Sequence, residues 1–250
     1  MGFLNNLFGR KEEKLPPFDL STLKVDMHSH LIPGIDDGSA NMDETIAMLA
    51  KFESLGYQKV ITTPHIMSDY YRNTPEIILS GLEKVKEAIS THNLKIKFEA
   101  AAEYYFDETL LERLAKKEKL LTFGDNYVLF EFSFHSEPNQ VDKLFFELLT
   151  QGYKPVLAHF ERYAFLFGKI EKAAEWREKG INIQLNINSL GGQYGPEVVA
   201  QSKALIDNGQ VDFVGTDCHR MDHLMILEQN LSKPYIHKFE SLNLKNASLL

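Results

Sequence analysis

Short apolar segments alternate with longer amphipathic ones along most of the chain. The short segments are rich in β-branched and aromatic residues and predict buried strands, whereas the longer ones repeat apolar residues every three or four positions and predict helices. The predicted strands are Leu23–Met27, Lys59–Thr63, Lys95–Ala101, Tyr127–Phe132, Pro155–Ala158, Ile181–Ile187 and Val211–Gly215. The predicted helices are Met42–Leu55, Pro75–Ser90, Glu108–Lys117, Gln140–Thr150, Ile170–Lys179 and Pro196–Asn208.

This alternation predicts an α/β fold of parallel strands joined by right-handed crossovers. Seven such units are typical of a TIM-like (β/α) barrel or a deeply curved sheet, with an open doubly wound sheet as the alternative. No linker rich in proline, glycine or serine divides the middle of the chain. We therefore expect a single barrel domain over residues 21–250, preceded by an N-terminal arm over residues 1–20.

The N-terminal arm contains Phe3, Leu4, Leu7 and Phe8, which could form an amphipathic turn. Such a turn would pack on the barrel, on a neighbouring subunit or on a membrane surface, so a homo-oligomer and a peripheral membrane contact are both compatible with it. Its apolar residues are interrupted and no small-residue cleavage site follows, so we do not expect a secretory signal. No apolar run approaches the roughly 20 residues of a transmembrane segment.

Composition narrows the class of protein. The chain has 250 residues, of which 44% are hydrophobic, and this is enough for one barrel with a sizeable core. The net charge of −8 argues against nucleic acid as a partner, and an anionic substrate would need local positive charge. Cys218 is the single cysteine, so no intrachain disulfide can form. A reducing compartment fits this composition, and we expect a cytoplasmic protein.

Ionisable residues gather where the predicted strands end. In chain order these are Asp26, His28, His30, Asp36, Asp37, His65, Glu103, Glu131, His159, Glu161, Arg162, Asp217, His219 and Arg220. Only the sixth strand offers amides instead, Asn186 and Asn188. The carboxyl ends of parallel strands meet at one rim, where barrels keep their active sites. We therefore expect these side chains to converge.

Each of these residues alone has an ordinary structural explanation. A buried Glu131 could form a salt bridge, and Asp217 or His219 could cap a helix. Together, five of the nine histidines and several carboxylates on one rim call for cations to balance the charge. His28 and His30 alternate along an extended strand and so point to one side. Mixed nitrogen and oxygen ligands suit Zn, Mn or Fe(II), and the pattern predicts a multinuclear metal site.

Other catalytic chemistries have less support in the sequence. A cysteine phosphatase needs a C-x5-R phosphate loop, but the sixth residue after Cys218 is Leu224. We expect Cys218 to be a small residue packed beside the ligands. The G-x-S-x-G, Walker A and G-x-G-x-x-G motifs do not occur.

A set of motifs runs in order from Val25 to Arg220: DMHSHLIPGIDDGS, TTPH, AAEYY, VLFEFSF, PVLAHFERY and GTDCHR. It resembles the polymerase-and-histidinol-phosphatase (PHP) superfamily, and more closely the bacterial protein-tyrosine phosphatases of capsule and exopolysaccharide operons. The resemblance covers nearly the whole chain and is highly specific as a set. It implies a distorted seven-stranded barrel of the PHP type. It also implies three divalent metal ions per chain, manganese first, with iron or zinc as alternatives.

The resemblance further implies roles for individual residues. The metal ligands would be His28, His30, Asp37, His65, Glu103, Glu131, His159, Asp217 and His219, with Glu103 as the bridging carboxylate. We take Asp37 rather than Asp36, because the family motif places the ligand directly before glycine. Arg162 would hold the substrate phosphate, and Arg220 is assigned as a second phosphate clamp.

The function that the resemblance implies is that of a metal-dependent protein-tyrosine phosphatase, which hydrolyses phosphotyrosine by attack of metal-bound hydroxide. Its substrate would be the tail of a bacterial tyrosine kinase that controls exopolysaccharide synthesis. A phenolate leaving group has a pKa near 10 and needs little protonation, although His223 or Asp222 could donate a proton. The alternatives are a small-molecule phosphatase, such as one for histidinol phosphate, and a catalytically silent regulatory barrel.

Aromatic residues lie near the predicted strand ends and could hold the ring of a substrate by stacking. They could equally pack in the rim and the core. These residues are Tyr70, Tyr71, Tyr104, Tyr105, Phe134, Phe160 and Tyr163.

Overall fold

The computed structural model describes residues 15–250, in which strands and helices alternate as predicted. The strands are β1 (Val25–Asp26), β2 (Lys59–Thr62), β3 (His65–Ile66), β4 (Lys97–Ala100), β5 (Glu103–Tyr105), β6 (Tyr127–Glu131), β7 (Lys154–Leu157), β8 (Asn182–Asn186) and β9 (Phe213–Gly215). The helices are α1 (Met42–Ser54), α2 (Pro75–Thr91), α3 (Glu108–Ala115), α4 (Val141–Thr150), α5 (Glu171–Glu178), α6 (Pro196–Asp207), α7 (Met221–Asn230) and α8 (Pro234–His237).

The six predicted helices are confirmed, and local sequence explains where several of them begin. Asn41 caps α1 by accepting a hydrogen bond from the backbone N–H of Glu44. Thr74 and Asp107 cap α2 and α3 in the same way, so that otherwise unpaired N–H groups are satisfied. Two further helices, α7 and α8, follow β9.

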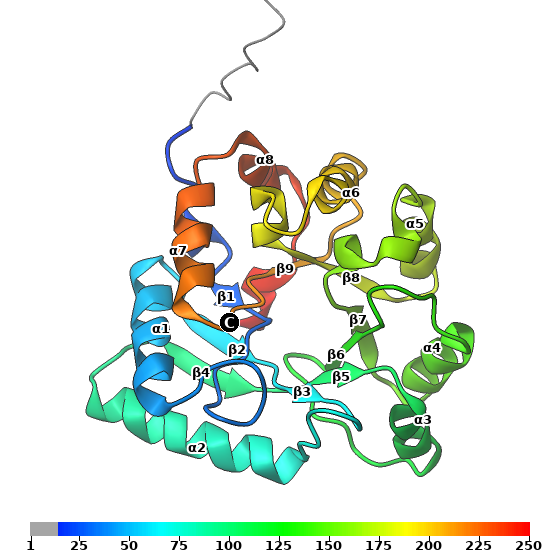
Figure 1. Ribbon diagram of the computed structural model, residues 1–250, viewed down its shortest axis with the longest axis horizontal. Helices are drawn as coiled ribbons and strands as arrows, with labels where there is room; N and C mark the ends of the chain where they lie inside the picture. The colour runs from blue at the N-terminus through cyan, green and yellow to red at the C-terminus, as the bar shows by residue number, and fades with distance from the viewer. Residues whose placement is uncertain (1–14) are drawn as a thin grey trace, which may run out of the picture.

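Every strand pair is parallel, which confirms the α/β class. The strands form a three-stranded sheet in the order β1-β2-β4 and a six-stranded sheet in the order β3-β5-β6-β7-β8-β9. Figure 1 shows the strands near the centre of the molecule with the helices arranged outside them. The carboxyl ends of the strands are thereby available to build one site.

The seven predicted strands correspond to seven of the nine strands, and the two short strands β3 and β5 were not predicted. β3 follows β2 after Thr63 and Pro64, and β5 follows β4 after Ala101 and Ala102. Pro64 has no N–H to donate to a sheet. Its carbonyl instead accepts a hydrogen bond from the backbone N–H of Glu103, at the start of β5. The chain therefore passes from one sheet to the other at these two points.

The edge strands β1 and β9 of the two sheets form no ladder with each other, but hydrogen bonds next to both ends of these strands connect them. Just beyond them Ser29 and Cys218 form a parallel bridge, and the N–H of His30 donates to the Cys218 carbonyl at 2.8 Å. On the other side Asn246 donates to the carbonyls of Val25 and Val214 at 3.0 and 2.7 Å. The curved sheets are held together where no strand ladder exists.

Two clusters of buried apolar residues make up the core. The larger one lies between strands and helices. The smaller one contains side chains from several strands together with Leu249, whose carbonyl accepts from Nζ of Lys59 on β2 at 2.7 Å. Figure 1 shows the C-terminus beside β1 and β2. No helix within residues 15–250 is long and apolar enough to cross a membrane.

The expected N-terminal arm is described only from Leu15 onward. Phe18 and Leu20 are buried in the larger core cluster, and the N–H of Phe18 donates to the carbonyl of Leu231 at 3.0 Å. Residues 15–20 thus pack against the segment that follows α7. The proposed amphipathic turn with Phe3, Leu4, Leu7 and Phe8 lies outside the described residues.

Candidate metal centre

Nine side chains that come from all parts of the chain meet at the carboxyl ends of the strands. They form four overlapping groups, and in each group the nearest nitrogen or oxygen atoms lie within 4.8 Å of one another. The groups are His30, Asp37, His65 and His219; His28, His30 and Glu103; His28, His159 and Asp217; and His65, Glu103 and Glu131. These are the nine residues that the family resemblance implies as ligands, and the structure brings all of them together.

Glu103, the first residue of β5, lies at the centre of the cluster and is fully buried. Its Oε2 lies 3.1 Å from Nε2 of His28 and 3.3 Å from Nε2 of His30. Its Oε1 lies 3.1 Å from Nε2 of His159. The two oxygens therefore face different members of the cluster, as a carboxylate that bridges two cations would.

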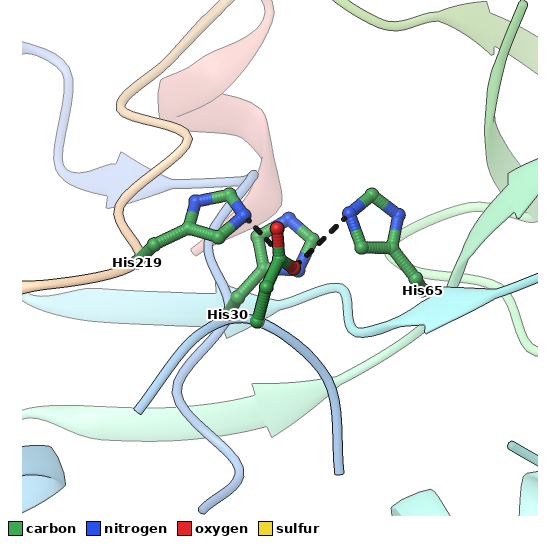
Figure 2. A group of neighbouring side chains, drawn as sticks. His30, His65 and His219 are labelled. Carbon is green, nitrogen blue, oxygen red and sulfur yellow. Dashed lines mark ion pairs between the residues drawn. The ribbon is translucent and has the colours of Figure 1, made fainter. Parts of the chain in front are cut away.

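One group lies at the mouth of the site. Figure 2 shows His30, His65 and His219 arranged around one point, with dashed ion pairs that run from His65 and His219 to the carboxylate of Asp37. The Nε2 atoms of these two histidines lie 3.6 and 3.4 Å from the same oxygen. The Asp37 side chain is half-exposed, so this group is the most accessible to solvent.

The adjacent aspartates Asp36 and Asp37 have different roles in the structure. The Asp36 carboxylate is buried, lies 2.8 Å from Nδ1 of His30 and accepts hydrogen bonds from the N–H groups of Gly38 and His65. Asp36 therefore orients His30 from outside the cluster, whereas Asp37 offers an oxygen within it. The turn requires glycine at position 38, because a Cβ there would lie 2.1 Å from the His30 carbonyl oxygen.

Several imidazoles have a hydrogen-bond acceptor on the side that faces away from the cluster. Nδ1 of His28 lies 3.1 Å from Oε1 of Gln184, and Nδ1 of His219 lies 2.9 Å from the Asp217 carbonyl. Asp36 serves His30 in the same way. A proton on each Nδ1 leaves the Nε2 lone pair directed inward, which is the form that binds a metal. Nε2 of His28 and Nε2 of His30 lie only 3.4 Å apart, an arrangement that a shared cation would satisfy.

Gln184 on β8 connects three parts of the cluster and is fully buried. Its Oε1 accepts from the backbone N–H of His159 at 2.8 Å as well as facing His28. Its Nε2 donates to Oδ1 of Asn186, whose Nδ2 donates to Oδ2 of Asp217 at 2.8 Å. Asn186 was expected at the end of the sixth predicted strand, whereas Gln184 was not. Gln184 and Asn186 are amides at alternate positions of a buried strand and so lie on one face of it. This spacing could have identified Gln184 from the sequence.

The backbone is strained at two of the nine residues. His159 directly follows the residue after β7 with φ 33°, and Asp217 lies two residues beyond β9 with φ 50°. Non-glycine residues rarely adopt this left-handed region, and such strain is concentrated at functional sites. The surroundings of β9 are also tight, since a Cβ on Gly215 would lie 2.8 Å from Cβ of His28.

The charges in the cluster perturb one another strongly. Burial lowers the pKa of His28, but the Glu103 and Asp217 carboxylates outweigh burial and raise this pKa to about 9. Burial raises the pKa of Asp217, but His28 and His219 outweigh it and hold that pKa well below its usual range. Without cations, protonated imidazoles thus neutralise the carboxylates. Protons and metal ions therefore compete for the same atoms.

Arg162 lies beside the cluster, in the short 3₁₀ turn that follows His159. Its Nη1 donates to Oδ2 of Asp217 at 2.9 Å, and its guanidinium lies between the rings of Phe134 and Tyr194, 4.5 and 4.4 Å from their centroids. Glu161 is not its partner, since that carboxylate is buried and accepts hydrogen bonds from Ser189 and Asn186. The positive charge of Arg162 thus faces the site.

A cavity of about 600 Å³ opens over the cluster. Tyr105, Phe134 and Tyr194 line it together with Arg162, and the exposed Tyr70 lies at its edge. Arg220 and His223 also line it, and Arg220 donates from Nε to Nε2 of His223 at 3.4 Å. Tyr194, between α6 and the turn before it, was not found from the sequence, because no motif marks it.

Several aromatic residues that were considered for substrate stacking have a structural role instead. Tyr104, Phe160 and Tyr163 are buried in the larger core cluster. The hydroxyl of Tyr104 accepts from the N–H of Leu121, and the hydroxyl of Tyr163 accepts from the N–H of Phe132. Tyr71 stacks on His65 with ring centroids 5.3 Å apart.

The thiol of Cys218 is also structural. It is fully buried, and its sulfur lies 3.8 Å from the sulfur of Met48. Burial and the nearby Asp26 raise the pKa of this thiol well above its usual range. The protonated thiol is a poor nucleophile, so the packing role that the sequence favoured fits the structure.

Comparison with known proteins places this site in a family context. The family model "Capsular polysaccharide synthesis, CpsB/CapC" matches residues 24–232. The tyrosine-protein phosphatase YwqE of Bacillus subtilis is 27% identical over 197 residues, which cover 79% of this chain and 78% of that protein. The putative tyrosine-protein phosphatase CapC of Staphylococcus aureus is 27% identical over 231 residues, which cover 90% of each chain.

The fold is similar to one in a crystallographic study of YwqE from Bacillus subtilis and CpsB from Streptococcus pneumoniae, described as unique metal-dependent tyrosine phosphatases. The TM-score is 0.76 at 24% identity, and the match covers 90% of this chain and 94% of the other. This similarity supports the arrangement of strands and helices given above.

Proposed function

The chain belongs to the CpsB/CapC family of capsular polysaccharide synthesis, and we propose that it is a metal-dependent protein-tyrosine phosphatase. The observation that carries the proposal is the cluster of five imidazoles and four carboxylates beside Arg162, at the floor of one cavity. The names of the relatives, which are tyrosine-protein phosphatases, support the substrate class.

The donor set fits divalent cations. It mixes imidazole nitrogens with carboxylate oxygens, and three imidazoles are held with Nε2 facing inward. We propose that the nine residues of the cluster hold three divalent ions, manganese first and iron or zinc as alternatives. Such ions supply charge neutralisation for a phosphate and lower the pKa of a water molecule.

The other residues of the cavity would bind and orient the substrate. Arg162 would hold phosphate oxygens, since its guanidinium is fixed between two rings and already faces the cluster. Arg220, which is exposed at the rim, is proposed as the second clamp. The substrate ring would lie against Tyr105, Phe134 or Tyr194, and the resulting phenolate leaves without a strong acid.

Burial lowers the pKa of His223, the residue suggested as a proton donor. The neutral ring therefore predominates near pH 7, with Nε2 accepting from Arg220 rather than carrying a proton toward the substrate. Asp222, the other candidate, is not among the described residues that line the cavity. Neither residue is needed for a phenolate leaving group.

The cavity favours phosphotyrosine over an amino alcohol phosphate such as histidinol phosphate. Recognition of the substrate amine would require a carboxylate apart from the metal ligands. Among the described residues that line the cavity, the only carboxylates are Asp37, Glu103, Glu131 and Asp217, all of which belong to the cluster. A silent regulatory barrel has less support, because none of the nine positions has lost its donor.

The finer parts of the assignment extend this proposal. We propose that the physiological substrate is the tail of a bacterial tyrosine kinase that controls exopolysaccharide synthesis. We also propose that residues 21–250 form one distorted barrel of the PHP type, with the bridge between Ser29 and Cys218 as part of its closure.

The test compares two substrates for the metal-loaded enzyme. We expect kcat/KM for a phosphotyrosine peptide to exceed that for histidinol phosphate by about 10²-fold or more, because the cavity has no free carboxylate for an ammonium. Glu103→Gln is the control, since loss of both activities locates the reaction at the cluster. Faster turnover of histidinol phosphate would contradict the substrate class, and no turnover of either substrate would favour the silent barrel.

A further inference from the structure

A second pocket of about 410 Å³ adjoins the cavity of the metal centre. The two share Met67 and Tyr105 in their walls and therefore lie next to each other. We call the second one the side pocket. It is lined by Ile66, Met67, Ser68, Asp69, Arg72, Asn73, Thr74, Tyr104, Tyr105, Asp107, Thr109, Leu110 and Arg113.

We propose that the side pocket binds an acidic side chain next to the phosphotyrosine of the protein substrate. This inference rests on the proposed phosphatase function and adds the sequence preference of that same site.

A short hairpin separates the side pocket from the main cavity. Met67 and Tyr71 pair in antiparallel fashion, with N–H to carbonyl distances of 2.9 and 3.1 Å in the two directions. Tyr70 lies at the tip, is 75% exposed and lines the main cavity, whereas Asp69 and Arg72 line the side pocket. A peptide with its phosphotyrosine at the metal centre would therefore meet both faces of this hairpin.

The frame of the side pocket is fixed by hydrogen bonds. Asp107 accepts from the backbone N–H of Ser68 with Oδ2 and from that of Leu110 with Oδ1. The carboxylate thus links the hairpin to the start of α3, and both of its oxygens already have donors. Asn73 donates to the carbonyls of Ile35 and His65, both at 2.9 Å. The pocket is thus a formed feature, and a peptide would not have to build it.

The side pocket is lined by two arginines and two aspartates, and both guanidinium groups keep donors that are unpaired within the described part of the chain. Nε of Arg72 donates to the carbonyl of Ser68 at 2.7 Å, and Arg72 makes no ion pair with any described carboxylate. Nη1 of Arg113 donates to Glu118 at 3.3 Å in an ion pair, while its buried Nε has no acceptor among the described residues. Asp69 is the one lining carboxylate that is not occupied by backbone donors. An incoming acceptor would satisfy these guanidinium groups.

The rest of the lining suits an aliphatic stem. Ile66, Tyr104 and Leu110 are buried and present apolar surface, and Met67 adds a flexible side chain. A glutamate side chain combines an apolar stem with a carboxylate at its end. It therefore matches both the apolar wall and the two arginines.

The test uses phosphotyrosine peptides that carry Glu, Gln or Lys at each of the two positions on either side of the phosphotyrosine. For the metal-loaded wild type we expect one position at which the peptide with Lys has a kcat/KM about tenfold lower than the peptide with Glu, since a charged hydrogen bond is replaced by repulsion between like charges. Arg72→Glu should reverse this order. Free phosphotyrosine, which cannot reach the side pocket, should be hydrolysed by both proteins at rates within about twofold of each other.

Lys84→Glu is the matched control, because it makes the same charge change on the nearby helix α2, outside both cavities. It should leave the peptide order unchanged. Thr109→Phe narrows the side pocket without a charge change and should slow only the Glu peptide. Melting temperatures show whether each variant is folded.

Equal rates on all peptides by the wild type would overturn the inference, as would an Arg72→Glu variant with an unchanged order. An equal loss on free phosphotyrosine and on peptides would place Arg72 at the metal centre or in the fold and would also overturn it. Failure of the wild type to hydrolyse free phosphotyrosine at all would instead contradict the proposed phosphatase function.

Discussion

At the scale of single residues, the candidate metal ligands were easier to predict than the residues that orient them. The nine clustered donors stand out in the sequence because histidines and carboxylates recur at predicted strand ends. The residues that orient them do not, since Gln184 and Asp36 act through contacts that only the fold creates. Arg162 was expected to hold phosphate, and the sequence did not indicate that it also pairs with Asp217 of the cluster.

Replacement of Arg162 by alanine should separate phosphate binding from metal binding. Asp217 keeps its hydrogen bond from Asn186, so metal content and melting temperature should stay near the wild-type values. The catalytic efficiency toward phosphotyrosine peptide should fall by about 10²-fold or more, the usual effect of losing one preorganised charged donor. Arg162→Lys should recover only part of it, since lysine lacks the planar fork. Near-normal turnover by the metal-loaded alanine variant would refute the assignment.

Replacement of Gln184 by leucine should weaken metal binding while the fold is kept. His28 would lose the acceptor that fixes its Nδ1, and the backbone N–H of His159 would lose its partner. Loss of such an orienting partner typically lowers metal affinity by about 10- to 100-fold, which a competitive chelator titration measures. Gln201→Leu is the control, a buried glutamine that bonds Gly168 and Leu166 away from the cluster. The idea fails if both variants bind metal equally well.

At the scale of elements, periodicity predicted most helices and seven strands but not the short strands β3 and β5. Helices such as α2 carry a long apolar stripe and clear capping residues, and their ends lie within two residues of the predicted ones. The strands β3 and β5 begin at His65 and Glu103 and have only two and three residues, too few to show a strand pattern. They arise from pairing with different neighbours, which is a tertiary effect.

The closure between β1 and β9 depends on an element that the sequence did not reveal. Asn246, in the last turn of the chain, accepts from the N–H of Val214 and donates to the carbonyls of Val25 and Val214. Asn246→Ala should lower the free energy of unfolding by about 1–3 kcal/mol or more, since buried backbone groups would lose their partners. Denaturant unfolding measures this, with the exposed Asn208→Ala as the control. Equal stability of the two variants would contradict this role.

At the scale of the whole molecule, the fold brings charged residues from distant sequence motifs into one cluster. The protein carries a net charge of −8, so a dianionic phosphate can approach only where metal ions and arginines outweigh the overall field. Without metal ions the cluster depends on protonated imidazoles, and its stability should therefore depend on pH.

The metal-free protein should lose stability as the pH rises from about 6.5 to about 9. In the fold, the Glu103 and Asp217 carboxylates raise the pKa of His28 from 6.5 to about 9. A group whose pKa is raised by folding stabilises the folded state fully when the pH is below its pKa in the unfolded chain. This stabilisation is lost as the pH rises through its pKa in the folded protein. Metal-loaded protein should lack this decline, because its imidazoles are already deprotonated. Melting temperatures of both forms across this range test the claim, and parallel curves would contradict it.

The central claim, that the cluster works as a metal centre for phosphate ester hydrolysis, is tested most directly by stepwise reconstitution. Protein stripped by a chelator would be titrated with Mn²⁺, while bound metal and the hydrolysis of phosphotyrosine peptide are measured in the same samples. We expect the stripped protein to be inactive and the activity to rise with bound metal up to about two to three ions per chain, as nine donors exceed what one ion can use. Full activity of the stripped protein, or saturation at a single ion, would contradict the account.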